Sequence, residues 1–439
     1  MNRLFLKIMG LVILLVATAR AADDPRIEGV IMDSKGRPIP NASVYVYSAK
    51  PREGEATMCA TCYPDCGKKA RTDDQGQFKI EKLNGDLLYR LLVTAKGWRV
   101  DYITDADPLF GSVEQRLKAH RWSDAPLDRK VIGKIIDPDG KSVAGAVLNI
   151  DGYRNGPYGN YGGVKGKVET FSGTDESGEF LITCTNGIGS ISATVEARGF
   201  AKRKVWLDAG SAHLLRMKRG VEVTGRLLQD GNPVPGVRVS MNSQDRSVES
   251  FLQGFDATTG PDGLFKIPNV PPNTAFFLAT RLKDAARLGL SLAPQTVNTG
   301  ADESTVKLGD LVLKAAHSIK GKVVLSDGKP VPGNTRVSLG FESGSDSLQA
   351  KVDEDGTFEF KGVPTESISL WVRVTGYRVS AKNPSKDWLN EGRLVGRLEG
   401  SLENFIIHLE PGARADRNEG PQDSSERQPR EKLLRGAKL

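Results

Sequence analysis

One short phrase recurs four times in the chain, and it restricts the folds that the chain can adopt. Each copy opens on a glycine, continues through three or four residues of mixed character into a turn with Asp or Gly, and closes on a proline or valine pair and a glycine or alanine. The copies open at Gly29, Gly133, Gly225 and Gly321, so successive copies lie 92 to 104 residues apart. Solenoid units are about 20–50 residues long, whereas one complete β-sandwich takes about 100. The phrase therefore predicts a row of β-sandwiches, one for each copy.

Two further landmarks follow each phrase in a constant order. The first is a segment with every second residue apolar, which is typical of a strand with one buried face. These segments are Ala42–Tyr47, Ala146–Ile150, Val237–Met241 and Arg336–Phe341. The second is a hairpin in which we expect Gly to take a positive φ and Phe to point into the core. The hairpins are Asp73–Phe78, Asp175–Phe180, Gly260–Phe265 and Asp353–Phe358. We favour turn chemistry over a calcium loop, because the repeats keep no acid pair beyond the turn.

A third landmark is a strand that closes on a glycine and an aromatic residue. It occurs at Leu91–Trp98, Ala193–Phe200 and Leu370–Tyr377, whereas the third repeat has Phe276–Lys283 without the glycine–aromatic end. A last strand is expected near Pro126–Leu127, Ala212–Met217, Lys307–Leu313 and Asn404–Leu409. These positions leave linkers of only a few residues, which restrict the angle between neighbouring domains. We therefore expect a rod or a gently bent chain.

Together these landmarks resemble the carboxypeptidase regulatory-like domain over most of residues 27–411. That family is a transthyretin-like β-sandwich, often grouped with carbohydrate-binding-like folds. The resemblance implies an all-β chain of four tandem Ig-like or transthyretin-like β-sandwiches. It implies little about activity, because the family is an accessory module in many unrelated secreted and outer-membrane proteins. The predicted sandwiches are 22–128, 129–219, 220–315 and 316–412.

The N-terminus has the pattern of a secretory signal peptide, residues 1–21. A positive region with Arg3 and Lys7 precedes an apolar stretch over 8–16 and the small-x-small site Ala19–Ala21. The apolar stretch is too short to span a bilayer, and no later stretch is long enough, so no transmembrane segment is expected after cleavage. Cleavage removes three basic residues and no acid, leaving 58 basic against 54 acidic residues. This small excess does not indicate nucleic-acid binding. We expect an exported protein that is periplasmic, on the cell surface or secreted.

No catalytic motif competes with the repeat. The histidines are His120, His213, His317 and His408, and none is followed by Glu at the third place, as a zinc carboxypeptidase resemblance would require. A Gly-x-Ser-x-Gly elbow and a Gly-rich phosphate loop are also absent from the sequence. We therefore expect no enzyme, no cofactor and no metal.

Four cysteines form the most unusual local feature. Cys59, Cys62 and Cys66 lie in an insertion of the first repeat, and Cys184 lies in the second. Export favours disulfides, with Cys59 or Cys62 and Cys66 as the preferred pair. The spacing also suits a thiolate metal site that recruits Cys184. Free thiols are the third alternative, and Cys184 is a candidate for a buried unpaired one.

A second insertion, over 151–163, is rich in Tyr and Gly. Tyr153, Tyr158 and Tyr161, with Arg154 and Asn160, are candidates for a carbohydrate-binding surface, since aromatic faces stack on sugars and polar groups bind hydroxyls. The alternative is a flexible loop without a ligand.

Three functions remain open from the sequence. The first is a non-catalytic exported binding or scaffold protein whose partner is a carbohydrate, a cell-envelope component or a protein. The second is a purely structural spacer or adhesin-like rod. The third is a metal or redox protein centred on the cysteines. The polar segment 413–439 is expected to be a disordered tail.

Overall fold

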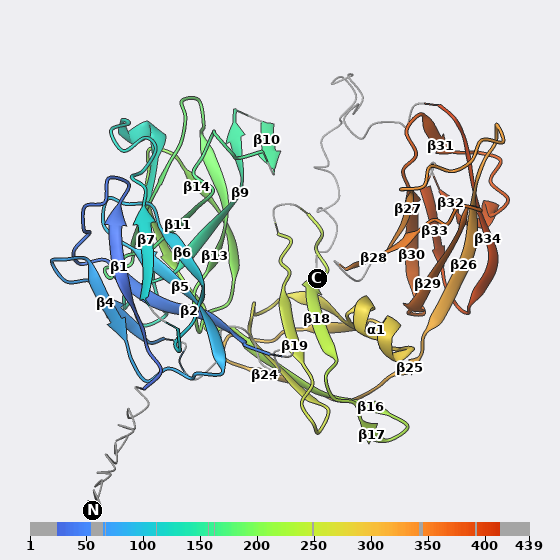
Figure 1. Ribbon diagram of the computed structural model, residues 1–439, viewed down its shortest axis with the longest axis horizontal. Coiled ribbons are helices and arrows are strands. Elements are labelled where there is room, and N and C mark those ends of the chain that lie inside the picture. The colour runs from blue at the N-terminus through green and yellow to red at the C-terminus, as the bar shows by residue number, and fades with distance from the viewer. Residues whose placement is uncertain are drawn as a thin grey trace, which may run out of the picture.

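The computed structural model confirms the predicted fold class: the chain forms four β-sandwiches in tandem (Figure 1). It describes residues 24–53, 65, 67–110, 112–156, 158–161, 163–247, 250–341, 346–390 and 393–412. The expected signal peptide and the expected tail lie outside these residues. Among the described residues, no helix is long and apolar enough to cross a membrane.

Sandwich 1 packs a three-stranded sheet on a four-stranded one. The first has the order β4 (Gln77–Ile80), β1 (Ile27–Asp33), β7 (Ser112–Leu117), and the second β3 (Lys69–Arg71), β2 (Ser43–Pro51), β5 (Leu87–Thr94), β6 (Asp101–Ala106).

Sandwich 2 repeats this plan. Its first sheet has the order β12 (Glu179–Thr183), β8 (Lys130–Ile136), β15 (Ala212–Arg216). Its second sheet has the order β10 (Tyr158–Tyr161), β9 (Val147–Asn155), β13 (Ser190–Glu196), β14 (Arg203–Asp208), with β11 (Phe171–Gly173) also paired to β9.

Sandwich 3 has the same two layers. The first sheet has the order β17 (Asn232–Pro233), β16 (Val221–Gln229), β20 (Leu264–Val270), with β24 (Thr305–Val312) also paired to β16. The second sheet has the order β19 (Phe255–Thr258), β18 (Arg238–Ser243), β21 (Ala275–Thr280), β23 (Gln295–Asn298). A small sheet pairs β22 (Leu290–Ser291) with β25 (Lys314–Ala315).

Sandwich 4 completes the row. Its sheets are β29 (Thr357–Val363), β26 (His317–Leu325), β34 (Leu402–Pro411), β31 (Tyr377–Val379), and β28 (Ser347–Lys351), β27 (Arg336–Phe341), β30 (Ser367–Val372), β33 (Arg393–Arg397), β32 (Leu389–Asn390). The helical segments are η1 (Leu127–Arg129), α1 (Leu282–Leu288) and η2 (Lys386–Trp388). Each sandwich encloses its own cluster of buried apolar side chains.

The repeated glycine has a steric role. In each sandwich it pairs across the sheet with the Phe of the hairpin, for example Gly133 with Phe180 and Gly321 with Phe358. A Cβ added at Gly133 would lie 2.5 Å from the Phe180 ring, and one at Gly321 would lie 2.5 Å from the Phe358 ring. In sandwiches 2, 3 and 4 the glycine therefore leaves space for the aromatic ring that closes the core, and in sandwich 1 Gly29 leaves space for Val113 on β7.

The hairpins behave as predicted. Their glycines all have positive φ, from +72° to +89°: Gly76, Gly178, Gly263 and Gly356. In the first two copies the carboxylate of Asp73 or Asp175 accepts hydrogen bonds from backbone N–H groups two and four residues later. The four phenylalanines are buried, with 3–5 % of their surface exposed.

One strand prediction is wrong. The last strand of sandwich 1 is β7, which pairs in parallel with β1, and not the segment at Pro126–Leu127. Those residues belong to the connection 118–129, where Leu127 begins η1. In β7 exposed polar side chains alternate with half-buried or buried ones, and only Val113 and Leu117 are apolar, so its apolar signal is weak. The other three last strands lie where expected, at β15, β24 and β34.

The arrangement of the sandwiches also differs from a straight rod. Sandwiches 1 and 2 lie side by side, sandwich 3 lies across their lower ends, and sandwich 4 stands beyond it (Figure 1). The connection 118–129 is longer than predicted, which allows sandwich 2 to lie beside sandwich 1 rather than continue its axis. The chain is therefore sharply bent.

Candidate functional site

The cysteine cluster lies mostly outside the described residues, since Cys59, Cys62 and Cys66 are not among them. Cys184 is buried and unpaired in the core of sandwich 2. Burial raises the pKa of its thiol to about 11, so at neutral pH it is protonated and a poor nucleophile. In the described part of the chain, no three His, Cys, Asp or Glu side chains are grouped as a metal site would require.

The end of the cysteine insertion is firmly anchored at Asp65, the residue before Cys66. Its carboxylate accepts hydrogen bonds from the Tyr89 hydroxyl at 2.5 Å and the Asn84 amide at 2.7 Å, and pairs with Lys68 at 2.7 Å. Burial acts to raise the pKa of Asp65, but these donors outweigh it and hold that pKa below its usual value.

The tyrosine-rich insertion is a β-hairpin made by β9 and β10, and it divides the candidate residues between two faces. Asn160 pairs with Tyr153, and Tyr153 packs against the core of sandwich 2. Tyr161 pairs with Gly152 on the other face, where it is 38 % exposed. Arg154 is on that same face, opposite Gly159, by the alternation of the strands. The side chain of Tyr158 lies outside the described structure.

Two residues that sequence reasoning missed complete this outer face. Trp206 on β14 lies under Arg154, whose guanidinium carbon is 3.9 Å from the ring centroid, and Tyr161 meets the same ring edge-on at 6.0 Å. Ser192 on β13 pairs with both Gly152 and Trp206. The Ser192 hydroxyl and the Trp206 indole nitrogen are buried without a hydrogen-bond partner. Only strand pairing brings these residues together, so no local sequence signal marks them.

Sandwiches 1 and 2 contact each other through a mixed apolar and polar interface. Leu92, Val100 and Val147 are buried there as one cluster with four aromatic side chains packed against them: Tyr45, Tyr47, Tyr102 and Phe171. The carboxylate of Glu176 in sandwich 2 accepts hydrogen bonds from Ser43 at 2.9 Å and Tyr45 at 3.0 Å in sandwich 1.

A buried carboxylate closes the other end of this interface. The side chain of Glu169 in sandwich 2 is 1 % exposed and lies 2.9 Å from Nδ1 of His120 and 3.6 Å from Nε of Arg99. It also accepts hydrogen bonds from the backbone amides of Arg121 and Thr183. Burial acts to raise the pKa of Glu169, but the His120 and amide contacts outweigh it, so the pKa is lowered and the group stays charged.

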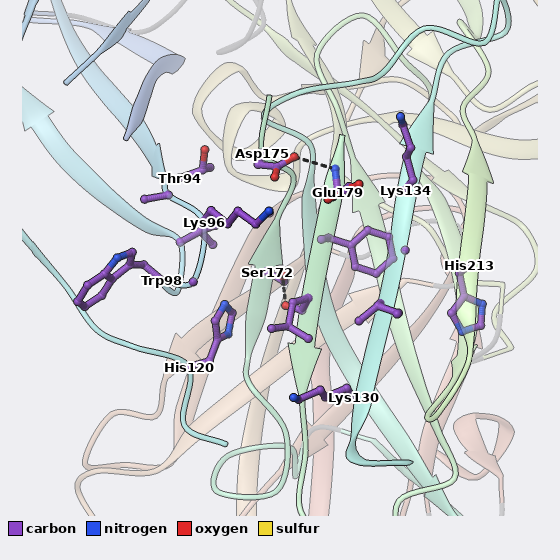
Figure 2. Close-up of a pocket in the computed structure, with 18 of the residues that line it drawn as sticks. Thr94, Lys96, Trp98, His120, Lys130, Lys134, Ser172, Asp175, Glu179 and His213 are labelled. Carbon is purple, nitrogen blue, oxygen red and sulfur yellow. Dashed lines mark hydrogen bonds between the residues drawn. The ribbon is translucent and has the colours of Figure 1, made fainter. Parts of the chain in front are cut away.

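An open groove lies next to this carboxylate, between the two sandwiches. We call it the interdomain groove; its volume is about 770 Å³. Figure 2 shows Trp98, Lys96 and His120 on one side, and the strands that carry Lys130, Lys134 and His213 on the other. Its floor is the outer face of the sheet β12–β8–β15, with Ile132, Leu181 and Leu214. Sequence reasoning did not point to this groove, because both sandwiches are needed to form it.

Comparison with known proteins gives distant structural similarity only. No family model matches the chain, and no curated protein matches it. The chain is similar to GBS52, the minor pilin of Streptococcus agalactiae, with 13% identity and a TM-score of 0.25 over 45% of this chain and 98% of that one. It is also similar to the Streptococcal ancillary pilin, with 11% identity and a TM-score of 0.23 over 65% and 100%, and to the Bacillus anthracis TIE protein, with 14% and 0.19 over 87% and 73%.

These values are too low to support any statement about function. No match confirms the resemblance to the carboxypeptidase regulatory-like domain. The structure supports the more general description, a chain of β-sandwich domains.

Proposed function

We propose that the protein is an exported, non-catalytic scaffold with a spacer or adhesin-like role in the cell envelope. The scaffold consists of the four sandwiches with the predicted boundaries 22–128, 129–219, 220–315 and 316–412. The observation that carries the proposal is that side chains brace every junction between neighbouring sandwiches. A chain braced in this way holds its surfaces at fixed positions, which is what a scaffold must do.

The first junction has been described above; the second is held mainly by charge. Arg219, in the short connection between sandwiches 2 and 3, pairs with Asp139 at 2.7 Å and with Glu303 at 3.2 Å. Lys202 of sandwich 2 lies 5.5 Å from the ring centroid of Phe255 in sandwich 3. These groups are partly exposed, so each contact stabilises the junction only modestly.

The third junction is apolar. Helix α1 of sandwich 3 packs on β29 of sandwich 4, and Ala279 and Leu282 belong to the same buried cluster as the core of sandwich 4. The Leu282 amide donates to the Asp346 carboxylate at 2.9 Å. A Cβ at Gly362 would lie 2.1 Å from the Ala286 amide nitrogen, so only glycine permits this close approach.

Cell fractionation with cross-linking in intact cells tests this function. We expect the full chain to reach an exported fraction without residues 1–21 and to cross-link to an envelope component. A cytoplasmic protein that keeps its N-terminus and forms no envelope cross-link would contradict the proposal.

Carbohydrate binding is the second candidate, favoured by the exposed Tyr161 beside Arg154 on the outer face of sandwich 2. Arg154 covers one face of Trp206, so Tyr161 is the ring offered to a sugar. A glycan array with the wild type and Tyr161→Ala tests this role: a bound glycan that the variant loses supports it, and no bound glycan removes it. A metal or redox role of the cysteines stays a prediction.

A further inference from the structure

We propose that the interdomain groove binds a small anionic amphiphile, a molecule with an apolar chain and one carboxylate or phosphate group. This goes beyond the scaffold function, since a scaffold needs no ligand there. Two independent observations lead to it: the apolar floor of the groove and the uncompensated lysines at its edge.

The four sandwiches provide their own comparison for the floor. At one register position, next to the repeated glycine, the outer faces of three sandwiches carry polar side chains. These are Glu28, Lys79 and Ser112 in sandwich 1, Thr224, Lys266 and Lys307 in sandwich 3, and Lys320 and Glu359 in sandwich 4. In sandwich 2 the same position has Ile132, paired with Leu181 on one side and Ala212 on the other.

The apolar floor extends beyond that position. Leu214, further along β15, is 65 % exposed. At the position beside the repeated glycine, the outer faces of the other three sandwiches are polar, as solvated sheet faces normally are, although sandwich 3 exposes Leu264 and Val312 elsewhere. An apolar row across all three strands that borders an open groove is therefore particular to sandwich 2, and it suits an apolar ligand chain.

The wall opposite the floor comes from the end of sandwich 1. Trp98 follows Gly97, whose φ of +84° turns the chain, and Trp98 and Val100 both line the groove, although the Trp98 ring points back toward sandwich 1, whose core it packs against (Figure 2). The volume of about 770 Å³ lies within the range of about 300–1,000 Å³ found for small-molecule sites.

The charge around the groove favours an anion. Within the described part of the chain, neither Lys96 nor Lys130 forms an ion pair, although both line the groove. Three lysines and two carboxylates, Asp175 and Glu179, line the groove, so its lining keeps a net positive charge, and Glu179 stands directly across from Lys134. His120 is already held by Glu169. Lys96 and Lys130 thus remain, one toward each end of the groove, and either can pair with a carboxylate or phosphate; Figure 2 shows Lys96 reaching from sandwich 1 toward the strands of sandwich 2.

Isothermal titration calorimetry on the full chain tests the site with decanoate, decyl phosphate and the uncharged decyl maltoside, all below micellar concentrations. We expect both anions to bind with one site and decyl maltoside to bind at least about tenfold more weakly, because it lacks the charge that the lysines attract. Comparing decanoate with decyl phosphate shows which anionic group is preferred.

The key variant copies sandwich 1 into sandwich 2. The double substitution Ile132→Glu and Leu181→Lys installs the pair found at Glu28 and Lys79, and we expect it to weaken decanoate binding at least about tenfold. Leu264→Lys removes an exposed leucine (52 % exposed) from sandwich 3 and is the matched control, with binding unchanged.

A second pair of substitutions, Lys96→Gln and Lys130→Gln, keeps the test valid if the first variant does not fold. It should weaken decanoate and leave decyl maltoside unaffected. The proposal is overturned if neither anion binds the wild type, if decyl maltoside binds as tightly as decanoate, or if a folded variant binds decanoate as the wild type does. The scaffold function is judged separately, because its cross-linking experiment does not depend on the groove.

Discussion

The junction between sandwiches 1 and 2 and the junction between sandwiches 3 and 4 both fix the positions of two neighbouring domains, but they do so with different contacts. The first uses the long connection 118–129 and an interface that buries the charged Glu169. At the junction between sandwiches 3 and 4 the connection is very short, and helix α1 places Leu282 in the core of sandwich 4. Both junctions rest on places where one repeat departs from the others. The shared repeat thus builds the sandwiches, and its departures build the contacts between them.

The largest effect is expected at the apolar junction. Leu282 is 1 % exposed, so Leu282→Asp buries an unpaired carboxylate and should lower the free energy of unfolding by about 4 kcal/mol or more. Calorimetric melting should show the loss in the transition of sandwich 4, while exposed Leu264→Asp changes little. An unchanged melting curve for Leu282→Asp would show that α1 does not brace this junction.

The junction between sandwiches 1 and 2 should respond less strongly to a substitution. Glu169→Gln keeps the size of the side chain but removes the charge that lies beside His120 and Arg99, at a cost of about 3 kcal/mol. Chemical denaturation of the wild type and the variant measures this difference. If Glu169→Gln is as stable as the wild type, the buried carboxylate contributes nothing to the interface.

Acid should destabilise the junction between sandwiches 1 and 2 more than the junction between sandwiches 3 and 4, without any mutation. The folded-state pKa of Glu169 is lowered from the ordinary value of 4.5, so its contribution is present above that pH and is lost as the pH falls through the lowered value. Melting of the wild type between neutral pH and pH values below 4.5 should show this loss, and Glu169→Gln should show a smaller one. Equal acid sensitivity in both proteins would point to other carboxylates.

The smallest effect is expected at Glu176, which accepts hydrogen bonds across the first junction but is partly exposed. Glu176→Gln should cost about 1 kcal/mol, since solvent screens the charge. Denaturation in low and high salt checks this, because the wild-type advantage should shrink with salt. A loss as large as that of Glu169→Gln would contradict the ranking by burial.

The sequence predicts what is local and repeated. The glycine–Phe pairs, the hairpins and three of the four last strands recur with the same spacing, so period and turn chemistry identify them. The features that were missed depend on contacts between segments far apart. The strand β7 is fixed by its pairing with β1, and α1 by its packing on sandwich 4. In the same way, Trp206 joins Tyr161 only through the strand order of the sheet.

The central claim is that the four sandwiches form one braced, bent assembly, and small-angle X-ray scattering of the protein in solution tests it most directly. We expect the scattering curve to be fitted by the bent arrangement of Figure 1 as a single conformation. The double variant Glu169→Gln and Leu282→Asp should scatter as a larger and more variable particle. A wild-type curve that requires independently moving sandwiches, or a straight rod, would contradict the account.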